Sequence, residues 1–431
     1  VRLLVQRNRR MHFLSVVIHA MLPIVLAGMD RDRLCKGTGT SFNGDAPENS
    51  MCQSVAMSER MATMLGDASG WSNGFTSSPV NLQILHESDK QLFHEGPVLF
   101  ESRHELYFTT NRMGDNTSGL EQYIDLMKYD LQSGQVVKVD AGVPMPNGMT
   151  KTLDGEKLLI CSQGHNTTGG AIIELDLDSL TARTVVSSYF GRRLNSPNDV
   201  DVASNGDIYF TDPIYGFVQG FRAGAPEMGN HVYKYTPQTD QLLVLSDTLV
   251  RPNGLALYEE AGLLFVSDSS FYEKPPWQGS QLRQNSIYGI EIDPEGSQIG
   301  GHSRRVLFNS PGDIQDGLVV YKPGNLLFAA GGGGIEVRDL CTNDFLGVIY
   351  TPKGGKGVTQ LIVPETPGKG TLYGLSEQRL WSMELVMPSE ASCTLTLDFP
   401  GPDSPSEPSG GTAALWVGIV ALCLAVFGLI G

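Results

Sequence analysis

Five side chains that carry oxygen recur at one point of a repeated sequence pattern. Each precedes a glycine or an aspartate at the start of a short apolar strand; they are Glu95, Asn147, Asn198, Asn253 and Asp316. Two carboxylates and three amide oxygens, without cysteine, are hard ligands that suit Ca²⁺ better than Zn²⁺ or copper. The set therefore predicts a calcium site, provided that the fold brings the five positions together.

A turn is the alternative explanation of this pattern. Pro-Asn-Gly, present at Asn147 and Asn253, is an ordinary turn signal, because proline fixes φ and Asn or Gly accepts left-handed geometry. Five copies in register, with Glu95 (a poor turn former) in the same column, favour a metal site over turns alone. Two carboxylates buried beside a narrow channel would also be costly without a cation.

The elements that position these residues are repeats of roughly fifty residues, a period typical of propeller blades. Copies begin at His94, Met145, Ser196, Arg251 and Ile314, and a weaker sixth copy spans Val358 to Leu385. Each copy reads as four short strands joined by turns rich in Gly, Asp, Glu or Asn. The pattern predicts an all-β, six-bladed β-propeller with four-stranded blades around a central metal-binding channel. Residues 75–92 are expected to supply the strand that closes the ring.

The propeller is expected to span residues 75–397, after a lead-in at 29–74. Residues 1–28 resemble a secretory leader, with a short apolar run that ends in small residues. Residues 398–412 form a Pro/Ser/Gly spacer before an apolar tail at 413–431. The tail predicts either a glycolipid-anchor signal or a membrane span, and membrane attachment is expected through this tail only.

Other features agree with an extracellular or cell-surface protein. Asn116 and Asn166 each begin an N-glycosylation sequon. Cys35 with Cys52, and Cys341 with Cys393, are plausible disulfide pairs. The formal net charge of −16, without clustered Lys and Arg, argues against a nucleic-acid partner.

The repeats also resemble a known family. The segments HEGPV, NSPNDVDVASNGDIYFTDPIYG, RPNGLALYEEAGLLFVSD and QDGLVV are similar, in order and spacing, to those of the gluconolactonase, senescence-marker-protein and luciferin-regenerating-enzyme superfamily of Ca²⁺-dependent six-bladed propellers. The resemblance covers roughly residues 80–385 of the chain. Within it, residues 198–235 are especially similar to secreted fungal lactonohydrolases. It implies that Glu95, Asn253 and Asp316 hold one Ca²⁺, and that Asn198 is either a ligand or a substrate contact.

The expected function is a secreted, calcium-dependent lactonase that opens a sugar-type or related lactone to its hydroxy acid. The metal polarises the carbonyl, and Asp316 activates the attacking water as general base. Asn147, Asn198, Tyr215 and His165 are the expected substrate contacts. Two alternatives stay open: a calcium-dependent phosphotriesterase-like hydrolase, and a propeller that only binds a ligand.

Four further polar residues near the repeated positions have either a structural or a functional explanation. Asp199 could orient Asn198, and His94 could face the mouth of the channel. Asp212 and Asp268 end the second strands of two repeats.

Overall fold

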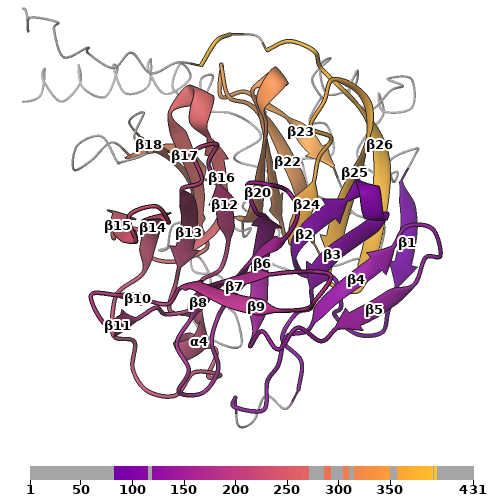
Figure 1. Cartoon of the computed structure of the whole chain (residues 1–431). Coiled ribbons are helices and arrows are strands. Elements are labelled where there is room, and N and C mark those ends of the chain that lie inside the picture. The colour runs from indigo at the N-terminus through magenta and orange to yellow at the C-terminus, as the bar shows by residue number, and fades with distance from the viewer. Residues whose placement is uncertain are drawn as a thin grey trace, which may run out of the picture. The chain divides into compact units, whose positions relative to one another are not determined.

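Six small antiparallel sheets of four strands each build the protein as a six-bladed β-propeller (Figure 1). The computed structural model describes residues 82–114, 119–270, 286–292, 304–309, 315–349, 357–391 and 393–395. The leader, the lead-in, the spacer and the tail lie outside the described residues, as do Asn116, Cys35 and Cys52. The described blades belong to one compact unit of the chain, residues 1–395.

The strands follow the predicted repeats in chain order. Blade 1 contains β2 (Glu95–Phe100), β3 (Glu105–Thr109), β4 (Leu126–Asp130) and β5 (Val136–Val139). Blade 2 contains β6 (Pro146–Lys151), β7 (Leu158–Ser162), β8 (Ala171–Leu175) and β9 (Ala182–Val186). Blade 3 contains β12 (Val200–Val202), β13 (Ile208–Asp212), β14 (His231–Thr236) and β15 (Gln241–Ser246), and a small hairpin, β10 (Ser188–Tyr189) and β11 (Arg192–Arg193), precedes it.

The second half of the ring repeats the same order. Blade 4 contains β16 (Pro252–Tyr258), β17 (Leu263–Asp268), β18 (Ser286–Glu291) and β19 (Arg304–Asn309). Blade 5 contains β20 (Gln315–Tyr321), β21 (Leu326–Gly331), β22 (Gly334–Asp339) and β23 (Phe345–Ile349). Blade 6 contains β24 (Gln360–Ile362), β25 (Gly368–Ser376), β26 (Arg379–Met387) and β1 (Gln83–Glu87).

The sixth blade combines the two ends of the described chain. Its outer strand β1 comes before blade 1 in sequence and pairs antiparallel with β26. The prediction that residues 75–92 close the ring is therefore confirmed. Closure of this kind protects sheet edges that would otherwise be free to pair with another chain.

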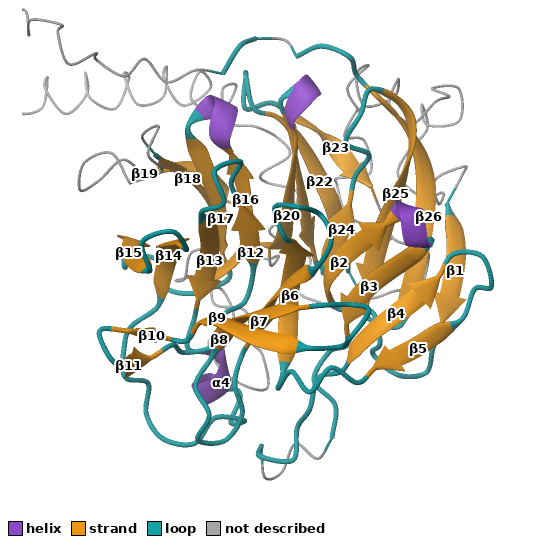
Figure 2. Ribbon diagram, in the orientation of Figure 1, coloured by secondary structure: helices purple, strands orange, loops and turns teal. Residues whose placement is uncertain are grey.

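Helices are few and short among the described residues (Figure 2). The turns η2 (Glu101–Arg103), η3 (Glu259–Ala261) and η4 (Lys322–Gly324) join first and second strands, and α4 (Tyr215–Val218) lies in the loop after β13. None of the described helices is long and apolar enough to cross a membrane.

Apolar side chains fill the space between neighbouring blades. One layer contains Tyr209 and Val232 from blade 3 with Leu255 and Val266 from blade 4, all of them buried. Because side chains alternate along each strand, these apolar side chains lie on the faces of the blades. Each face is buried by packing against the neighbouring blade. The predicted pairing of Cys341 with Cys393 is confirmed, and the disulfide ties blade 5 to the segment that follows β26.

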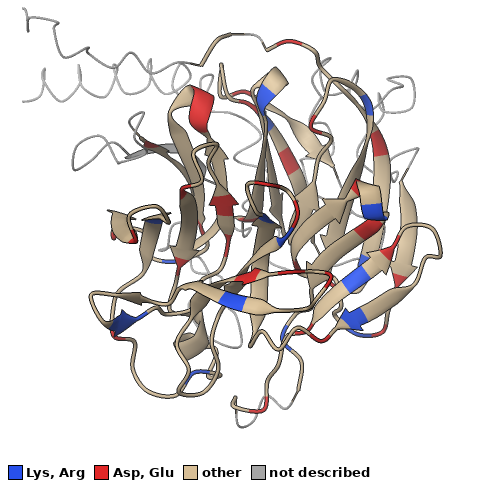
Figure 3. Ribbon diagram, viewed as in Figure 1, with Lys and Arg blue, Asp and Glu red and all other residues tan. Residues whose placement is uncertain are grey.

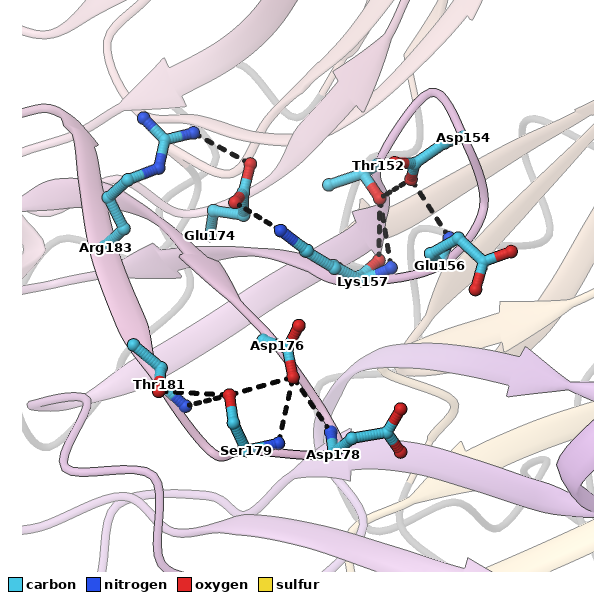
Figure 4. A network of polar contacts seen from close by, with 10 residues as sticks. All are labelled: Thr152, Asp154, Glu156, Lys157, Glu174, Asp176, Asp178, Ser179, Thr181 and Arg183. Atoms are coloured by element: carbon cyan, nitrogen blue, oxygen red, sulfur yellow. Dashed lines mark hydrogen bonds and ion pairs between the residues drawn. The ribbon is translucent and has the colours of Figure 1, made fainter.

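Charged side chains on the surface of blade 2 pair with each other. Lys and Arg are scattered among Asp and Glu over the blades (Figure 3). On blade 2, the Glu174 carboxylate lies 3.1 Å from Lys157 Nζ and 2.8 Å from Arg183 Nη2 (Figure 4). Because these groups are exposed or half-buried, such pairs contribute little to stability. The outer surface of blade 2 therefore has a structural explanation, unlike the buried charges at the channel.

Candidate metal and active centre

The five side chains that the sequence placed in one column lie at the same end of the innermost strands of five blades. Each lies at or just before the start of the innermost strand of its blade, and each is between 3% and 7% exposed. We refer to Glu95, Asn147, Asn198, Asn253 and Asp316 as the polar ring.

Hydrogen bonds divide the polar ring into two groups. Asn253 Nδ2 donates to Asp316 Oδ1 over 2.6 Å, and the carboxyls of Asp316 and Glu95 also hydrogen bond. Across the ring, Asn198 Nδ2 donates to Asn147 Oδ1 over 2.9 Å. Each of these contacts joins different blades, so the fold alone brings the groups together.

Two amide oxygens of the ring are left without a donor. Asn198 Oδ1 and Asn253 Oδ1 are both buried and have no hydrogen-bond partner. A buried acceptor without a partner typically costs about 1–3 kcal/mol. Asn147 differs, since its oxygen accepts the bond from Asn198. The unpaired oxygens therefore mark Asn198 and Asn253 as the amides available to a cation.

The two carboxyls are held in an environment that disfavours their charge. Burial, with the neighbouring carboxylate of Asp316, raises the pKa of Glu95 well above its usual range. Burial also raises the pKa of Asp316 to about 6. Two carboxyls in contact without a cation keep a proton between them, because they cannot both ionise. A bound cation would instead favour both charges.

The donor set fits calcium by its chemistry. Two carboxylates and two unpaired amide oxygens are all hard ligands, and their two negative charges match a divalent ion. Within the described part of the chain, no group of three or more His, Cys, Asp or Glu side chains is placed to hold a metal. A site in this fold thus depends on its amide oxygens as much as on its acids.

Glu95 does not occupy the same strand position as the other four residues, contrary to the alignment made from the sequence. Regular pairing between first and second strands aligns Val98, Met149, Val200, Leu255 and Leu318. The other ring residues lie two positions before these residues, but Glu95 lies three before Val98. Gly96, at φ 58°, redirects the chain here, because glycine adopts left-handed backbone without strain.

The backbone of the ring is held by hydroxyl groups of the preceding blade. Thr211 Oγ1 donates to the carbonyl of Asn253 over 2.7 Å, and Ser267 Oγ donates to the carbonyl of Asp316 over 2.8 Å. Gly254 directly follows Asn253, and a Cβ atom at this position would collide with the Asp316 carbonyl oxygen. The glycine that follows a ring residue therefore serves close packing of blades and not only a turn.

Asp212 and Asp268 are structural residues with equivalent roles. Asp212 Oδ2 accepts from the N–H of Asn195 over 2.9 Å. Asp268 accepts from the N–H groups of Val250 and Arg251 over 2.8 Å and 3.1 Å. Each carboxylate thus fixes the segment that leads into the first strand of its own blade.

Asp199 joins two blades and does not orient Asn198, the functional explanation that the sequence allowed. Its carboxylate accepts from the N–H of Leu255 in blade 4 over 2.9 Å, and burial raises its pKa to about 7. Asp201 makes the corresponding bond to Leu257 over 3.0 Å. The amide of Asn198 is held by Asn147 instead.

Tyr215 reaches the polar ring from the loop above it. It begins α4 and is 8% exposed, and its hydroxyl hydrogen bonds to Ser269. Burial and the charge of Asp316 raise its pKa. The predicted substrate contact therefore lies within electrostatic range of a ring carboxylate.

His165 and Asn166 lie in the loop after β7, which leaves its blade at the same end as the polar ring. His165 Nε2 is buried and has no hydrogen-bond partner. Asn166 exposes its side chain, while its backbone bonds to Phe221 and Ala223 in the loop that contains α4. The two loops are therefore paired over this end of the blades.

His94 contacts the carboxylate of Glu377, a residue that the sequence analysis did not identify. His94 Nδ1 lies 3.2 Å from Glu377 Oε1, and Asn111 donates to both oxygens of Glu377. Burial lowers the pKa of His94. The carboxylate of Glu377 raises the pKa by more than burial lowers it, so the net shift is upward. Glu377 directly follows the second strand of blade 6, as Ser269 follows that of blade 4. This position after the second strand was the available signal for both residues.

Comparison with known proteins agrees with this architecture. The family model of the SMP-30/gluconolactonase/LRE-like region matches residues 93–373, more than half of the chain. A gluconolactonase of Zymomonas mobilis is 33% identical over 212 residues, which cover 48% of this chain and 55% of the relative. A lactonohydrolase of Aspergillus oryzae is 24% identical over 261 residues, which cover 57% of this chain and 58% of the relative.

A solved structure of a gluconolactonase from Xanthomonas campestris superposes with a TM-score of 0.57 at 26% identity. The superposition covers 78% of this chain and 96% of that protein. The chain spans just over half the length of the two curated relatives above.

Proposed function

Because the chain belongs to the SMP-30/gluconolactonase/LRE-like family, we propose that it hydrolyses a lactone at the polar ring. The observation that carries this proposal is the convergence of two buried carboxyls and two unpaired amide oxygens from four blades. Two relatives named as a gluconolactonase and a lactonohydrolase support a sugar-type or related lactone as substrate and its hydroxy acid as product.

We assign Glu95, Asn198, Asn253 and Asp316 as the residues that hold Ca²⁺. Their oxygens fit the ion, and two of them lack any other partner. When bound, the ion would supply Lewis-acid polarisation of the lactone carbonyl. The coordination of a divalent ion also removes the reason for the two acids to keep a shared proton.

The remaining chemistry belongs to the side chains around the ring. Asp316 accepts a proton from the attacking water, since its buried carboxylate belongs to the ring and a bound cation would keep it ionised. The hydroxyl of Tyr215, which hydrogen bonds to Ser269, is proposed to contact the substrate. His165, with its unpaired Nε2, and Asn147 and Asn198 are the other proposed substrate contacts.

The decisive experiment follows proton release from a panel of aldonolactones and pantolactone. The full-length protein is expected to release protons from the lactone when Ca²⁺ is present. Excess chelator should stop this proton release. Asp316→Asn should lower the rate at least about 100-fold, the usual effect of losing a general base. Asp201→Asn is the matched control, because Asp201 lies in the channel wall but binds only backbone N–H groups in the described contacts.

Other outcomes of this experiment would contradict the proposal. Full turnover in chelator, or undiminished turnover by Asp316→Asn, would exclude this site. Cleavage of a phosphotriester but of no lactone would favour the phosphotriesterase-like alternative. Calcium binding without turnover of either substrate class would favour a propeller that only binds a ligand.

An extracellular location, with membrane attachment through the tail at 413–431, is part of the same proposal. The Cys341–Cys393 disulfide supports an oxidising compartment, and the exposed side chain of Asn166 is accessible to glycosylation. A mobility shift after endoglycosidase treatment of the protein expressed in a eukaryotic host would test it. An unshifted protein found only in the cytosol would overturn it.

A further inference from the structure

Ser269 contacts the amide of a proposed metal ligand but is not itself a member of the polar ring. It directly follows β17, and it is 2% exposed. Its Oγ accepts a hydrogen bond from Asn253 Nδ2 over 2.9 Å and donates one to the carbonyl of Gln315 over 2.8 Å. The hydroxyl of Tyr215 is its third partner.

These bonds decide whether Ser269 acts as a hydrogen-bond donor or as an acceptor toward Asn253. A hydroxyl group has one proton, and that of Ser269 is donated to a carbonyl oxygen, which can only accept. Toward Asn253, Ser269 therefore acts as an acceptor, and it matches the NH₂ end of the amide but not the oxygen end. The second proton of Asn253 Nδ2 is donated to Asp316 Oδ1 over 2.6 Å.

The consequence is an amide with one orientation. Both protons of Asn253 Nδ2 are used, while Asn253 Oδ1 is buried and has no partner. In the reversed orientation the oxygen would face two acceptors, Ser269 Oγ and the Asp316 carboxylate. Asn147 acts in the same way on Asn198, because its oxygen accepts from Asn198 Nδ2 and leaves Asn198 Oδ1 unpaired.

We propose that Ser269 is a positioning residue that fixes the Asn253 amide with its oxygen toward the polar ring, and so raises the affinity of the ring for Ca²⁺. The inference depends on the proposed function, since it assumes that the ring binds calcium. Partners that orient metal ligands typically change metal affinity about 10- to 100-fold.

The test compares Ser269→Ala with wild type in the full-length protein. Isothermal titration with Ca²⁺ alone is expected to show an affinity lower by about 10- to 100-fold. Ser162→Ala is the matched control, because Ser162 is equally buried and donates to the carbonyl of Pro144 over 2.7 Å. It should lower the melting temperature of the calcium-free protein as much as Ser269→Ala does, with no change in affinity.

A double-mutant cycle with Asn253→Asp separates positioning from a general structural effect. A carboxylate presents an oxygen in either orientation, so it needs no orienting partner. In the Asn253→Asp background, Ser269→Ala should therefore change calcium affinity less than about threefold.

The outcomes distinguish this inference from the proposed function. Wild type that binds no calcium would refute the metal centre itself. Wild type that binds calcium, with Ser269→Ala at equal affinity, would refute only the role of Ser269. Equal losses in the wild-type background and in the Asn253→Asp background would likewise show that Ser269 acts through the fold and not through the amide.

Discussion

At the scale of single residues, hydrogen-bond partners separate functional from structural polar groups. Asp268 and Asp316 are both buried aspartates, but both oxygens of Asp268 bind backbone N–H groups of its own blade, whereas Asp316 faces Glu95 and Asn253. Burial alone cannot tell the two apart. The partners can, because a carboxylate bound to backbone N–H groups has less of its charge available to a ligand.

Asp212 should make stability depend on pH in a way that Asp212→Asn removes. Burial raises its folded-state pKa to about 7, above the usual 3.8 expected when unfolded. The folded protein thus holds the proton more tightly, and the stabilisation is complete below about pH 4 and is lost as the pH rises through about 7.

Urea unfolding of both proteins between about pH 4 and pH 8 measures this effect. As the pH rises over this range, the free energy of unfolding of Asp212→Asn should increase relative to that of wild type by up to about 4 kcal/mol. A difference between the two proteins that stays constant with pH would contradict the shifted pKa. Comparing the variant with wild type cancels the titration of the polar ring, which both proteins share.

At the scale of elements, the glycines after the ring residues let the first strands of adjacent blades approach. In blade 4, Gly254 faces the backbone of Asp316 and Gly317 in blade 5. Hydroxyls of second strands then hold the carbonyls of the next blade. A change in the packing of the innermost strands should therefore also displace the ring residues.

Gly254→Ala should destabilise the protein and weaken the site together. The added Cβ would collide with the Asp316 carbonyl, and overpacking of this kind typically costs about 1–3 kcal/mol. Because the strained atom belongs to a proposed ligand, calcium affinity should also fall. Thermal unfolding and calcium titration measure the two effects.

Gly229→Ala is the control for this substitution, since the nearest atom to its Cβ lies at an ordinary 3.8 Å, on the side chain of His231. It should leave both quantities nearly unchanged. A stable Gly254→Ala protein with wild-type affinity would show that the blades can separate here without disturbing the ring.

At the scale of the whole molecule, the ring draws its proposed ligands from blades 1, 3, 4 and 5. One ion bound to four blades would link parts of the chain that are otherwise held by side-by-side packing and by the closing strand β1. Ligand binding to the folded state alone stabilises it by mass action.

Calcium should therefore raise the melting temperature of the wild-type protein. At a free concentration about one hundred times the dissociation constant, the gain in unfolding free energy is about 2.7 kcal/mol. Differential scanning calorimetry with calcium, and then with chelator, measures it. Asp316→Asn should show a much smaller gain, and a wild-type protein with no gain would contradict the assigned ligands.

The sequence by itself determined the blades, the closing strand and the ring column to within one residue at Glu95. These follow from local alternation and from a repeat, and both are properties of the linear chain. Only the tertiary structure decided the pairing of Cys341 with Cys393, which ring oxygens lack a donor, why Asp199 joins blades, and which side chains Ser269 and Glu377 contact. The reason is that these assignments depend on contacts between residues that are distant in sequence, such as the hydrogen bond between Asn253 and Asp316, which are 63 residues apart.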